Sequence, residues 1–389
     1  MHYLDHNATS PLRPESLSAV THAVGVGGNP SSIHASGRAA RAIMDEARER
    51  VAALVNGASA TVIFTSGATE SNNLALFGAA EGSLEGEASR ITRVFVSAIE
   101  HSSVLATAAR LAERFPWIRV ATLPVTAEGV IDLEALRVAL REGKGRALVA
   151  VMAANNETGV VQPIAEISQL VRESGALLLV DAVPAAGKIS IDFTLCDYLT
   201  LSAHKMGGPQ GVGALLVANG APLAPQLAGG GQQKGLRAGT ENLAGIAGFG
   251  VAAHALRDAP GEHDRIAHLR DHFEVRLKEM ASESVIFGAS APRLCSTSCF
   301  AIPGLTAETA LIGLDLDGVM LSSGSTCSSG KVAVSHVLTA MGVEAELASC
   351  ALRASFGWNS TAEDINAAIQ SLLKLRERIR ATSSNDRAA

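Results

Sequence analysis

In Ala176-Leu-Leu-Leu-Val-Asp181 an apolar run ends in an acid, and in Tyr198-Leu-Thr-Leu-Ser-Ala-His-Lys205 a second apolar run ends in a lysine. Helix-length segments such as 133–141 and 164–174 lie between runs of this kind. Further apolar runs occupy 61–65, 93–97, 119–123, 147–151 and 214–217. Strands this apolar, separated by helical segments, predict an α/β fold whose mostly parallel sheet is covered on both faces.

The chain is long enough for more than one domain, since it has 389 residues and a domain typically has roughly 150. Near Pro260 the pattern changes to long, charged helical segments around shorter strand candidates. This change predicts a second, smaller α+β domain. We expect a large domain over 15–258, a small domain made of 1–14 and 259–380, and a polar tail at 381–389.

The overall composition excludes several classes of function. The net charge is −6 and no basic stripe is present, which argues against nucleic acid as a partner. No apolar run approaches the roughly 18 residues of a membrane span, and the N-terminus lacks the pattern of a secretory signal. The five cysteines are sparse and lack zinc spacing, so we expect reduced thiols, no metal site and a cytoplasmic location.

Asp181 and Lys205 together suit pyridoxal phosphate. A lysine amine forms a Schiff base with the aldehyde of this cofactor, and an acid keeps the pyridine nitrogen protonated so that the ring withdraws electrons. Strand ends commonly carry polar residues, however. A strand-end salt bridge, or two unrelated solvated charges, therefore explains the pair equally well.

Two glycine-containing loops are candidate phosphate sites. Thr65-Ser-Gly-Ala-Thr-Glu-Ser-Asn72 follows a strand and opens a helix, where backbone N–H groups and hydroxyls can approach a phosphate. The same stretch also has the spacing of a capping box, and both interpretations can hold together. The loop from Gly229 to Asn242 either adds phosphate contacts or is a plain flexible connection.

Several single side chains are candidates for ligand contacts. His101 follows a strand and could stack on an aromatic cofactor or shuttle protons, although a lone histidine is more often structural. Asn156 belongs to a polar stretch that suits ligand oxygens or a turn. Ser202 and His204 flank Lys205 and could donate to a phosphate. Arg353 could hold a carboxylate bidentately or pair with a surface acid.

Cys327 is a candidate nucleophile. It lies in Leu321-Ser-Ser-Gly-Ser-Thr-Cys-Ser-Ser-Gly330, a loop of small residues. Free cysteines are usually buried, so a thiol on such a loop is poorly placed for packing. The thiolate is the reactive form, which requires that the loop favours deprotonation or offers a nearby base.

Taken in order, these motifs resemble the pyridoxal-phosphate cysteine desulfurases of the NifS/IscS group. The resemblance runs from Tyr3-Leu-Asp-His-Asn-Ala-Thr9 to Arg353 and includes Asn155-Asn-Glu-Thr-Gly159, Ala203-His-Lys205 and Arg237-Ala-Gly-Thr-Glu-Asn242. It implies the fold-type-I architecture of pyridoxal-phosphate transferases, with a large domain and a small α+β domain. It also implies a homodimer with cofactor sites near the subunit interface.

The resemblance also implies a role for each site residue. Lys205 is the Schiff-base lysine, Asp181 the partner of the pyridine nitrogen, and His101 stacks on the ring and is placed to move protons. The other implied contacts are Ala68, Thr69, Ser202 and His204 to the phosphate, Thr240 to the phosphate of the other subunit, and Asn156 and Arg353 to the substrate carboxylate. Asn156 also lies near the cofactor, and Cys327 accepts sulfur.

The implied reaction converts L-cysteine to L-alanine and leaves a persulfide on the enzyme. That sulfur is then delivered to an iron–sulfur scaffold or another acceptor in cluster assembly or thiolation. Two alternatives remain open at this point. One is a selenocysteine or cystine lyase on the same fold, and the other is a pyridoxal-phosphate-binding sulfur-relay protein of low turnover.

The chain departs from the family pattern in two places. Pro184 stands where the family has a glutamine at the phenolic oxygen of the cofactor, and proline has no donor to offer. We expect this change to alter the pKa and visible spectrum of the bound cofactor rather than to abolish binding. Around the cysteine, Thr326 replaces the usual alanine and Lys331-Val-Ala-Val334 is also unusual, which leaves the acceptor protein open.

Overall fold

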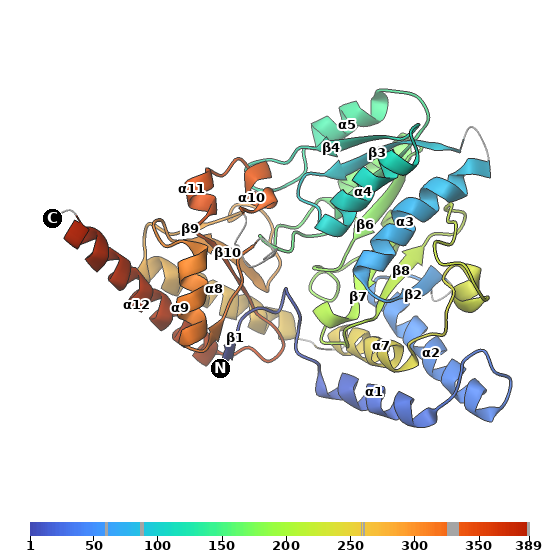
Figure 1. The fold of residues 1–389 in the computed structure, drawn as a ribbon, viewed down its shortest axis with the longest axis horizontal. Helices are drawn as coiled ribbons and strands as arrows, with labels where there is room; N and C mark the ends of the chain where they lie inside the picture. The colour runs from blue at the N-terminus through green and yellow to red at the C-terminus, as the bar shows by residue number, and fades with distance from the viewer. Residues whose placement is uncertain (59–60, 86–88, 258, 260, 325–333, 387–389) are drawn as a thin grey trace.

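A seven-stranded sheet forms the centre of the larger part of the molecule in the computed structural model (Figure 1). The structure describes residues 1–58, 61–85, 89–257, 259, 261–324 and 334–386. The strand order is β2-β8-β7-β6-β5-β3-β4. In that order the strands are Val62–Thr65, Gly213–Val217, Tyr198–Ser202, Leu177–Asp181, Arg146–Met152, Ile91–Ser97 and Arg119–Leu123.

The sheet is mostly parallel, as the sequence predicts. The pairs β7–β6, β6–β5, β5–β3 and β3–β4 are parallel, whereas β8 runs antiparallel to both of its neighbours. Each of the seven apolar runs forms one of these strands. The α/β prediction is therefore confirmed.

Helices cover both faces of this sheet, which explains why inner strands such as β5, β6 and β7 are buried along almost their whole length. One core cluster joins the sheet to Met44, Leu136, Ile167 and Phe249, and a second cluster joins its other face to Leu74 and Leu111. The helices concerned are α2 (Ala35–Leu54), α5 (Leu133–Arg141), α6 (Ile164–Glu173) and α7 (Leu243–Arg257) on the first face, with α3 (Ala68–Gly82) and α4 (Ser102–Arg114) on the second. Helix α1 (Pro14–Val26) packs on α7.

The smaller part is built on a three-stranded antiparallel sheet of order β12-β10-β9. Its strands are Ala351–Ser355, Thr297–Ala301 and Val285–Ile286, and the separate pair β1 and β11 comprises His2–Tyr3 and Val319–Met320. Its helices are α8 (Glu262–Met280), α9 (Ala307–Leu316), α10 (His336–Ala340), α11 (Ala345–Ala348) and α12 (Ala362–Asp386). Leu4 packs in the core of this part beside Phe273 and Phe300. This packing supports the proposed assignment of residues 1–14 to the small domain.

Short 3-10 helices occupy connections of the larger part, at Ser83–Glu85, Phe193–Leu195, Ala203–Lys205 and Gln232–Gly235. The third of these follows β7 directly. Parallel strands end at one edge of the sheet, so polar residues after β5, β6 and β7 meet there. The N-terminal segment crosses the same edge, because the N–H of Ser10 donates to the carbonyl of His204 at 2.8 Å and Asp5 bridges to Ser355.

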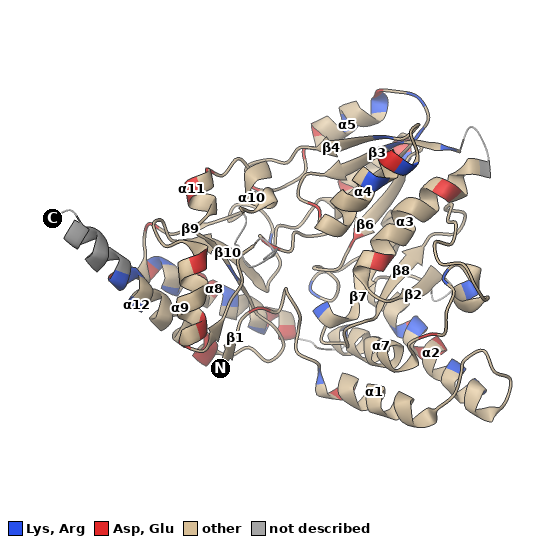
Figure 2. Cartoon of the chain, viewed as in Figure 1, with Lys and Arg blue, Asp and Glu red and all other residues tan. Residues whose placement is uncertain are grey.

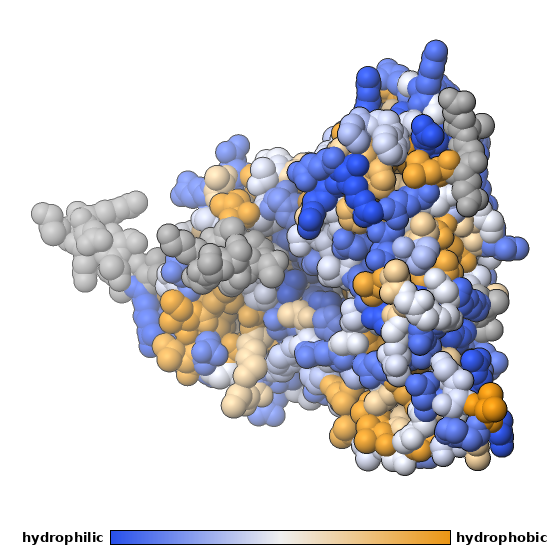
Figure 3. Space-filling model, turned by 45° about the vertical axis from the view of Figure 1, so that its right-hand side comes forward, coloured by the Kyte–Doolittle hydropathy of each residue, from blue (hydrophilic) through white to orange (hydrophobic). Residues whose placement is uncertain are grey.

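The surface carries charges of both signs in both parts, as Figure 2 shows, without a continuous basic stripe in the view drawn. On the face seen in Figure 3, hydrophobic residues form separate patches among hydrophilic ones. Exposed apolar side chains include Leu17 and Val24 on α1, Ile33 after it, and Ile312 and Leu316 on α9. Within the described residues, no helix combines the length and apolarity needed to cross a membrane.

Candidate active site

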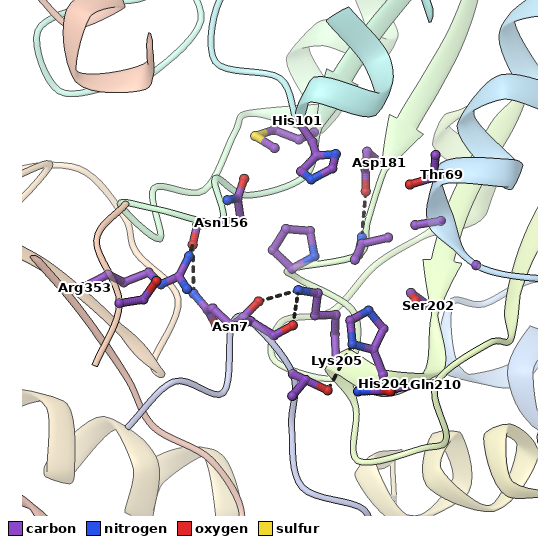
Figure 4. Close-up of a pocket in the computed structure, with 18 of the residues that line it drawn as sticks. Asn7, Thr69, His101, Asn156, Asp181, Ser202, His204, Lys205, Gln210 and Arg353 are labelled. Carbon is purple, nitrogen blue, oxygen red and sulfur yellow. Dashed lines mark hydrogen bonds between the residues drawn. The ribbon is translucent and has the colours of Figure 1, made fainter. Parts of the chain in front are cut away.

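A cavity of about 720 Å³ lies where the carboxyl ends of the central strands meet the smaller part and the N-terminal segment. Figure 4 shows ten of its residues labelled, with side chains from both parts pointing into it. The structure brings together here every predicted site residue except Thr240 and Cys327. The predicted site residues that line the cavity are Ala68, Thr69, His101, Asn156, Asp181, Ser202, His204, Lys205 and Arg353.

Lys205 does not form an ion pair with Asp181 in the described part of the chain. Its Nζ donates instead to the backbone carbonyls of Asn7, at 2.5 Å, and Ala8, at 2.8 Å (Figure 4). Burial lowers the pKa of Lys205 to about 8, and the nearby Arg353 and Lys188 add to the effect. A larger share of the amine is therefore neutral near physiological pH, and the neutral amine is the form that attacks a carbonyl. The salt-bridge alternative for this pair is wrong.

Asp181 is the last residue of β6, and two hydrogen bonds fix the orientation of its carboxylate. Its Oδ1 accepts the backbone N–H of Val183 at 3.0 Å, and its Oδ2 accepts the Nδ2–H of Asn72 at 2.9 Å. Asn72 also donates to Ser103 Oγ at 3.0 Å. These neutral donors orient the carboxylate without neutralising it, so it remains able to accept a hydrogen bond from a ring N–H⁺.

His101 is the N-cap of α4, with its ring at the cavity wall. Its Nδ1 accepts the backbone N–H of Ser103 at 3.1 Å and lies 2.8 Å from Ser103 Oγ. Burial lowers the pKa of His101, and the charge of Lys205 adds to this effect while Asp181 opposes it. The ring is therefore neutral near pH 7, and since Nδ1 accepts, we assign the proton to Nε2.

A set of neutral donors surrounds the N-terminus of α3. The N-cap of this helix is Gly67, and no side chain caps it. Thr69, Ser202 and His204 line the cavity beside it, and burial lowers the pKa of His204 to about 4, so its imidazole is neutral. An uncapped helix N-terminus and nearby hydroxyls suit a phosphate.

Only one of the two hydrogen bonds of a capping box forms at the start of α3. Glu70 accepts the N–H of Ser66 at 2.8 Å, but the reciprocal side-chain cap is absent from this described helix end. Glu70 also binds Arg237 at 2.8 Å, and this ion pair lowers the Glu70 pKa against the opposing effect of burial. The first-turn N–H groups therefore keep room for an anion.

Arg353 occupies the opposite side of the cavity, on the edge strand β12. Its Nη2 donates to Asp5 Oδ1 at 2.8 Å and its Nη1 donates to the Asn156 carbonyl at 3.1 Å. Its buried Nε has no partner in the described residues. The guanidinium is thus fixed in orientation at the wall of the cavity, which suits an incoming carboxylate.

The donor set fits pyridoxal phosphate. This cofactor carries an aldehyde, a basic ring nitrogen and a phosphate, and the cavity offers an amine, a carboxylate and an anion cradle. Each of the three stands on a different element, namely the turn after β7, the end of β6 and the start of α3. The flat ring between them would pass beside the neutral imidazole of His101.

Thr240 lies outside this cavity. It is exposed and lines a smaller cavity of about 130 Å³, together with Ser66, Arg237 and Asn242. Its predicted contact belongs to a second subunit, which one chain does not contain. Cys327 falls within 325–333, outside the described residues.

Some contacts at this site were missed by the sequence analysis. Asn7 accepts from Lys205 through its carbonyl and from Lys188 Nζ through its Oδ1 at 3.2 Å, and its Nδ2 donates to Thr297 Oγ1 at 2.9 Å. Lys188 also lines the cavity, and burial lowers its pKa to about 8. The only signal for Asn7 in the sequence is its place in the N-terminal motif.

Comparisons with known proteins agree with this geometry. A family model described as aminotransferase class-V matches residues 2–368. The cysteine desulfurase IscS of Dictyoglomus turgidum is 39% identical over 386 residues, covering 98% of this chain and 96% of the relative. A NifS-like protein from Rickettsia africae superposes with a TM-score of 0.87 at 33% identity, covering 97% and 99% of the two chains. SspA in complex with cysteine gives a TM-score of 0.80 at 29% identity, covering 93% and 100%.

Proposed function

Since the chain belongs to the aminotransferase class-V family and is a pyridoxal-phosphate-dependent cysteine desulfurase, we propose a role for each residue of its site. Its architecture is that of the fold-type-I enzymes. Lys205 holds the cofactor covalently, Asp181 binds its ring nitrogen, and His101 stacks on its ring. Ala68, Thr69, Ser202 and His204 bind its phosphate, with Thr240 contributed by a second subunit. When bound, the cofactor supplies an electron sink for negative charge on the substrate carbon.

We propose that L-cysteine is oriented from its carboxylate end. Arg353 and Asn156 bind that carboxylate, which directs the substrate amine toward Lys205. His101 then lies within the cavity as a neutral base. One chain of hydrogen bonds through Asn7 supports this most. The Asn7 carbonyl accepts from Lys205, and its Nδ2 donates to the Asn156 carbonyl at 3.1 Å. The same Asn156 carbonyl accepts from Arg353.

We propose that Cys327 carries out the sulfur transfer. Its thiolate attacks the substrate sulfur and forms an S–S bond. The carbon–sulfur bond breaks with its electron pair left on carbon, and a proton on that carbon completes alanine. Lys205 moves that proton in this proposal, and its pKa, lowered by burial to about 8, supports the role because both protonation states are then accessible near neutral pH.

Incubation of the purified, cofactor-loaded protein with L-cysteine and a thiol reductant tests this function. Alanine and sulfide are expected in equal amounts, since each turnover yields one of each. L-Selenocysteine and L-cystine serve as comparison substrates. Faster turnover of either with little alanine from L-cysteine would favour a lyase instead.

Arg353→Lys is expected to weaken substrate binding. Lysine cannot reproduce a guanidinium held by Asp5 and the Asn156 carbonyl, so the carboxylate loses one charged hydrogen bond. Such bonds contribute about 1.5–3 kcal/mol, so KM for L-cysteine should rise roughly 10- to 100-fold with a smaller change in kcat. Steady-state kinetics measure both values. Arg50→Lys, on an exposed helical ion pair, is the control and should change neither. A fall in kcat at constant KM would contradict this role.

Pro184→Gln is expected to change the visible spectrum of the bound cofactor. Pro184 lines the cavity three residues after Asp181 and offers no donor. Glutamine would add an N–H donor for the phenolic oxygen, which stabilises its ionised form and lowers the pKa at which the visible band changes. A spectrophotometric pH titration follows this change. An unchanged titration would refute the assignment, provided that cofactor content is equal in both proteins.

We propose further that the active form is a homodimer, that it is cytoplasmic, and that its acceptor is an iron–sulfur scaffold or another thiolation protein. The exposed Leu17, Val24 and Ile33 support a covered surface near α1. The four described cysteines carry free thiols, which supports a reducing compartment. Light scattering of the purified protein tests the dimer, and mixing with candidate scaffolds tests the acceptor by transfer of labelled sulfur.

A further inference from the structure

Glu157 is buried, with an exposed fraction of 3%, beside the described residues on either side of 325–333. On the C-terminal side, Ser335 Oγ donates to Glu157 Oε2 at 2.5 Å. On the N-terminal side, a Cβ placed on Gly324 would lie 2.5 Å from the same oxygen. One carboxyl oxygen therefore bonds to a residue on one side of 325–333 and leaves no room for a side chain on the residue at the other side.

Both ends are also attached to residues that line the cavity or adjoin them. Ser322 and Arg353 exchange backbone hydrogen bonds of 2.7 and 3.3 Å. At the other end, His336 Nε2 lies 3.0 Å from the carbonyl of Glu100, the residue before His101. Ser322, before 325–333, thus lies beside the proposed carboxylate-binding arginine, and His336, after it, lies next to the residue that precedes the proposed ring-stacking histidine.

Glu157 is itself held firmly. Its backbone N–H donates to Asn155 Oδ1 at 2.8 Å, and it directly follows Asn156, whose carbonyl accepts from Arg353. Ser335 Oγ also accepts the N–H of Leu338 at 3.1 Å as the N-cap of α10. The bond between Glu157 and Ser335 therefore links the substrate side of the cavity to the start of that helix.

We propose that Glu157 is a positioning residue for sulfur transfer. Its carboxyl group forms a tie between the substrate side of the cavity and the residues that flank 325–333, through its bond to Ser335 and its close packing against Gly324. The inference rests on the proposed function, since it takes Cys327 as the sulfur acceptor. Loss of this tie slows transfer to Cys327 without weakening the binding of pyridoxal phosphate or L-cysteine.

The tie responds to pH. Burial raises the pKa of Glu157 to about 7, while its bond to Ser335 and the charge of Arg353 on β12 act in the opposite direction. The thiol of Cys299 on β10 also faces this carboxyl group. As the pH rises through about 7 the carboxylate forms, and it accepts a stronger, charge-assisted bond from Ser335. Transfer should therefore gain speed over this range by more than thiolate formation alone supplies.

The test compares Glu157→Gln, Ser335→Ala, their double variant and the exposed control Glu166→Gln, each loaded with cofactor. Rapid quenching after mixing with L-cysteine, followed by mass spectrometry, gives the rate at which Cys327 gains one sulfur. Cofactor content and the spectral change on adding L-cysteine report binding. The alkylation rate of Cys327 by iodoacetamide, measured without L-cysteine, reports the segment independently of turnover.

Ser335→Ala removes the bond to Glu157 and should slow transfer by about tenfold. Glu157→Gln removes the charge but leaves an amide oxygen that can still accept from Ser335, so its effect should be smaller. The double variant should be no slower than Ser335→Ala, because both changes act on the same bond. Alkylation should change in the same variants, binding should stay within about twofold, and Glu157→Gln should lose the pH dependence near 7. Gly324→Ala, which leaves Glu157 in place but adds a methyl group against its oxygen, should also slow transfer.

Transfer rates close to those of the unchanged protein in both single variants would overturn the proposal. So would single effects that multiply in the double variant, or a loss of L-cysteine binding as large as the loss of rate. If the unchanged protein forms no persulfide on Cys327, the proposed function itself fails, and this inference fails with it.

Discussion

Lys205→Ala is expected to abolish the visible absorption of the bound cofactor and to lower kcat for L-cysteine by at least about 10³-fold, since it removes both the covalent attachment and a proton-transfer group. Lys205 Nζ sits at the cavity with a pKa lowered to about 8 and bonds only to backbone carbonyls among the described residues. The absorption spectrum of the purified variant, with added pyridoxal phosphate, measures the first effect.

Lys188 provides the decisive comparison for this prediction. It lines the same cavity and has a similarly lowered pKa, so it is the other amine that could attach the cofactor. Lys188→Ala should keep the visible band. A band that survives in Lys205→Ala and disappears only in the double variant would move the attachment to Lys188 and contradict the assignment.

Cys327→Ala is expected to keep the cofactor and its response to L-cysteine while losing alanine formation by about 10²-fold or more, because the nucleophile that takes sulfur is gone. Spectroscopy and amino-acid analysis measure the two effects separately. The matched control is Cys350→Ala, a buried cysteine of the smaller part that lies away from the cavity. Alanine formation that persists undiminished in Cys327→Ala would contradict a persulfide mechanism.

The sheet could be predicted because its inner strands are buried on both faces. Runs such as 147–151 are apolar throughout, so strand positions can be read without knowing the pairing partners, and their polar ends mark the edge where a ligand binds. Asp181, Lys205 and His101 all follow such runs, and the structure places them around one cavity. The apolar runs do not show which of these side chains form hydrogen bonds or ion pairs with one another.

The contacts made by Asn7 and Glu157 could not be predicted, because their partners lie far away in the chain. Asn7 bonds to Thr297, and Glu157 bonds to Ser335, 178 positions further along. Neither residue lies in a periodic apolar pattern that would show its orientation. The salt bridge between Asp181 and Lys205 was a reasonable alternative for the same reason, since backbone carbonyls that hold a lysine leave no mark in the sequence. The domain boundaries stay predictions.

The central claim is that Cys327 receives sulfur from L-cysteine held by the residues around Lys205. Its most direct test mixes the cofactor-loaded protein with one equivalent of L-cysteine, without reductant, and locates the added mass by peptide mass spectrometry. The account predicts one extra sulfur on the peptide that contains Cys327, together with one equivalent of alanine. Alanine and free sulfide with no sulfur retained on Cys327, or retention on another cysteine, would contradict it.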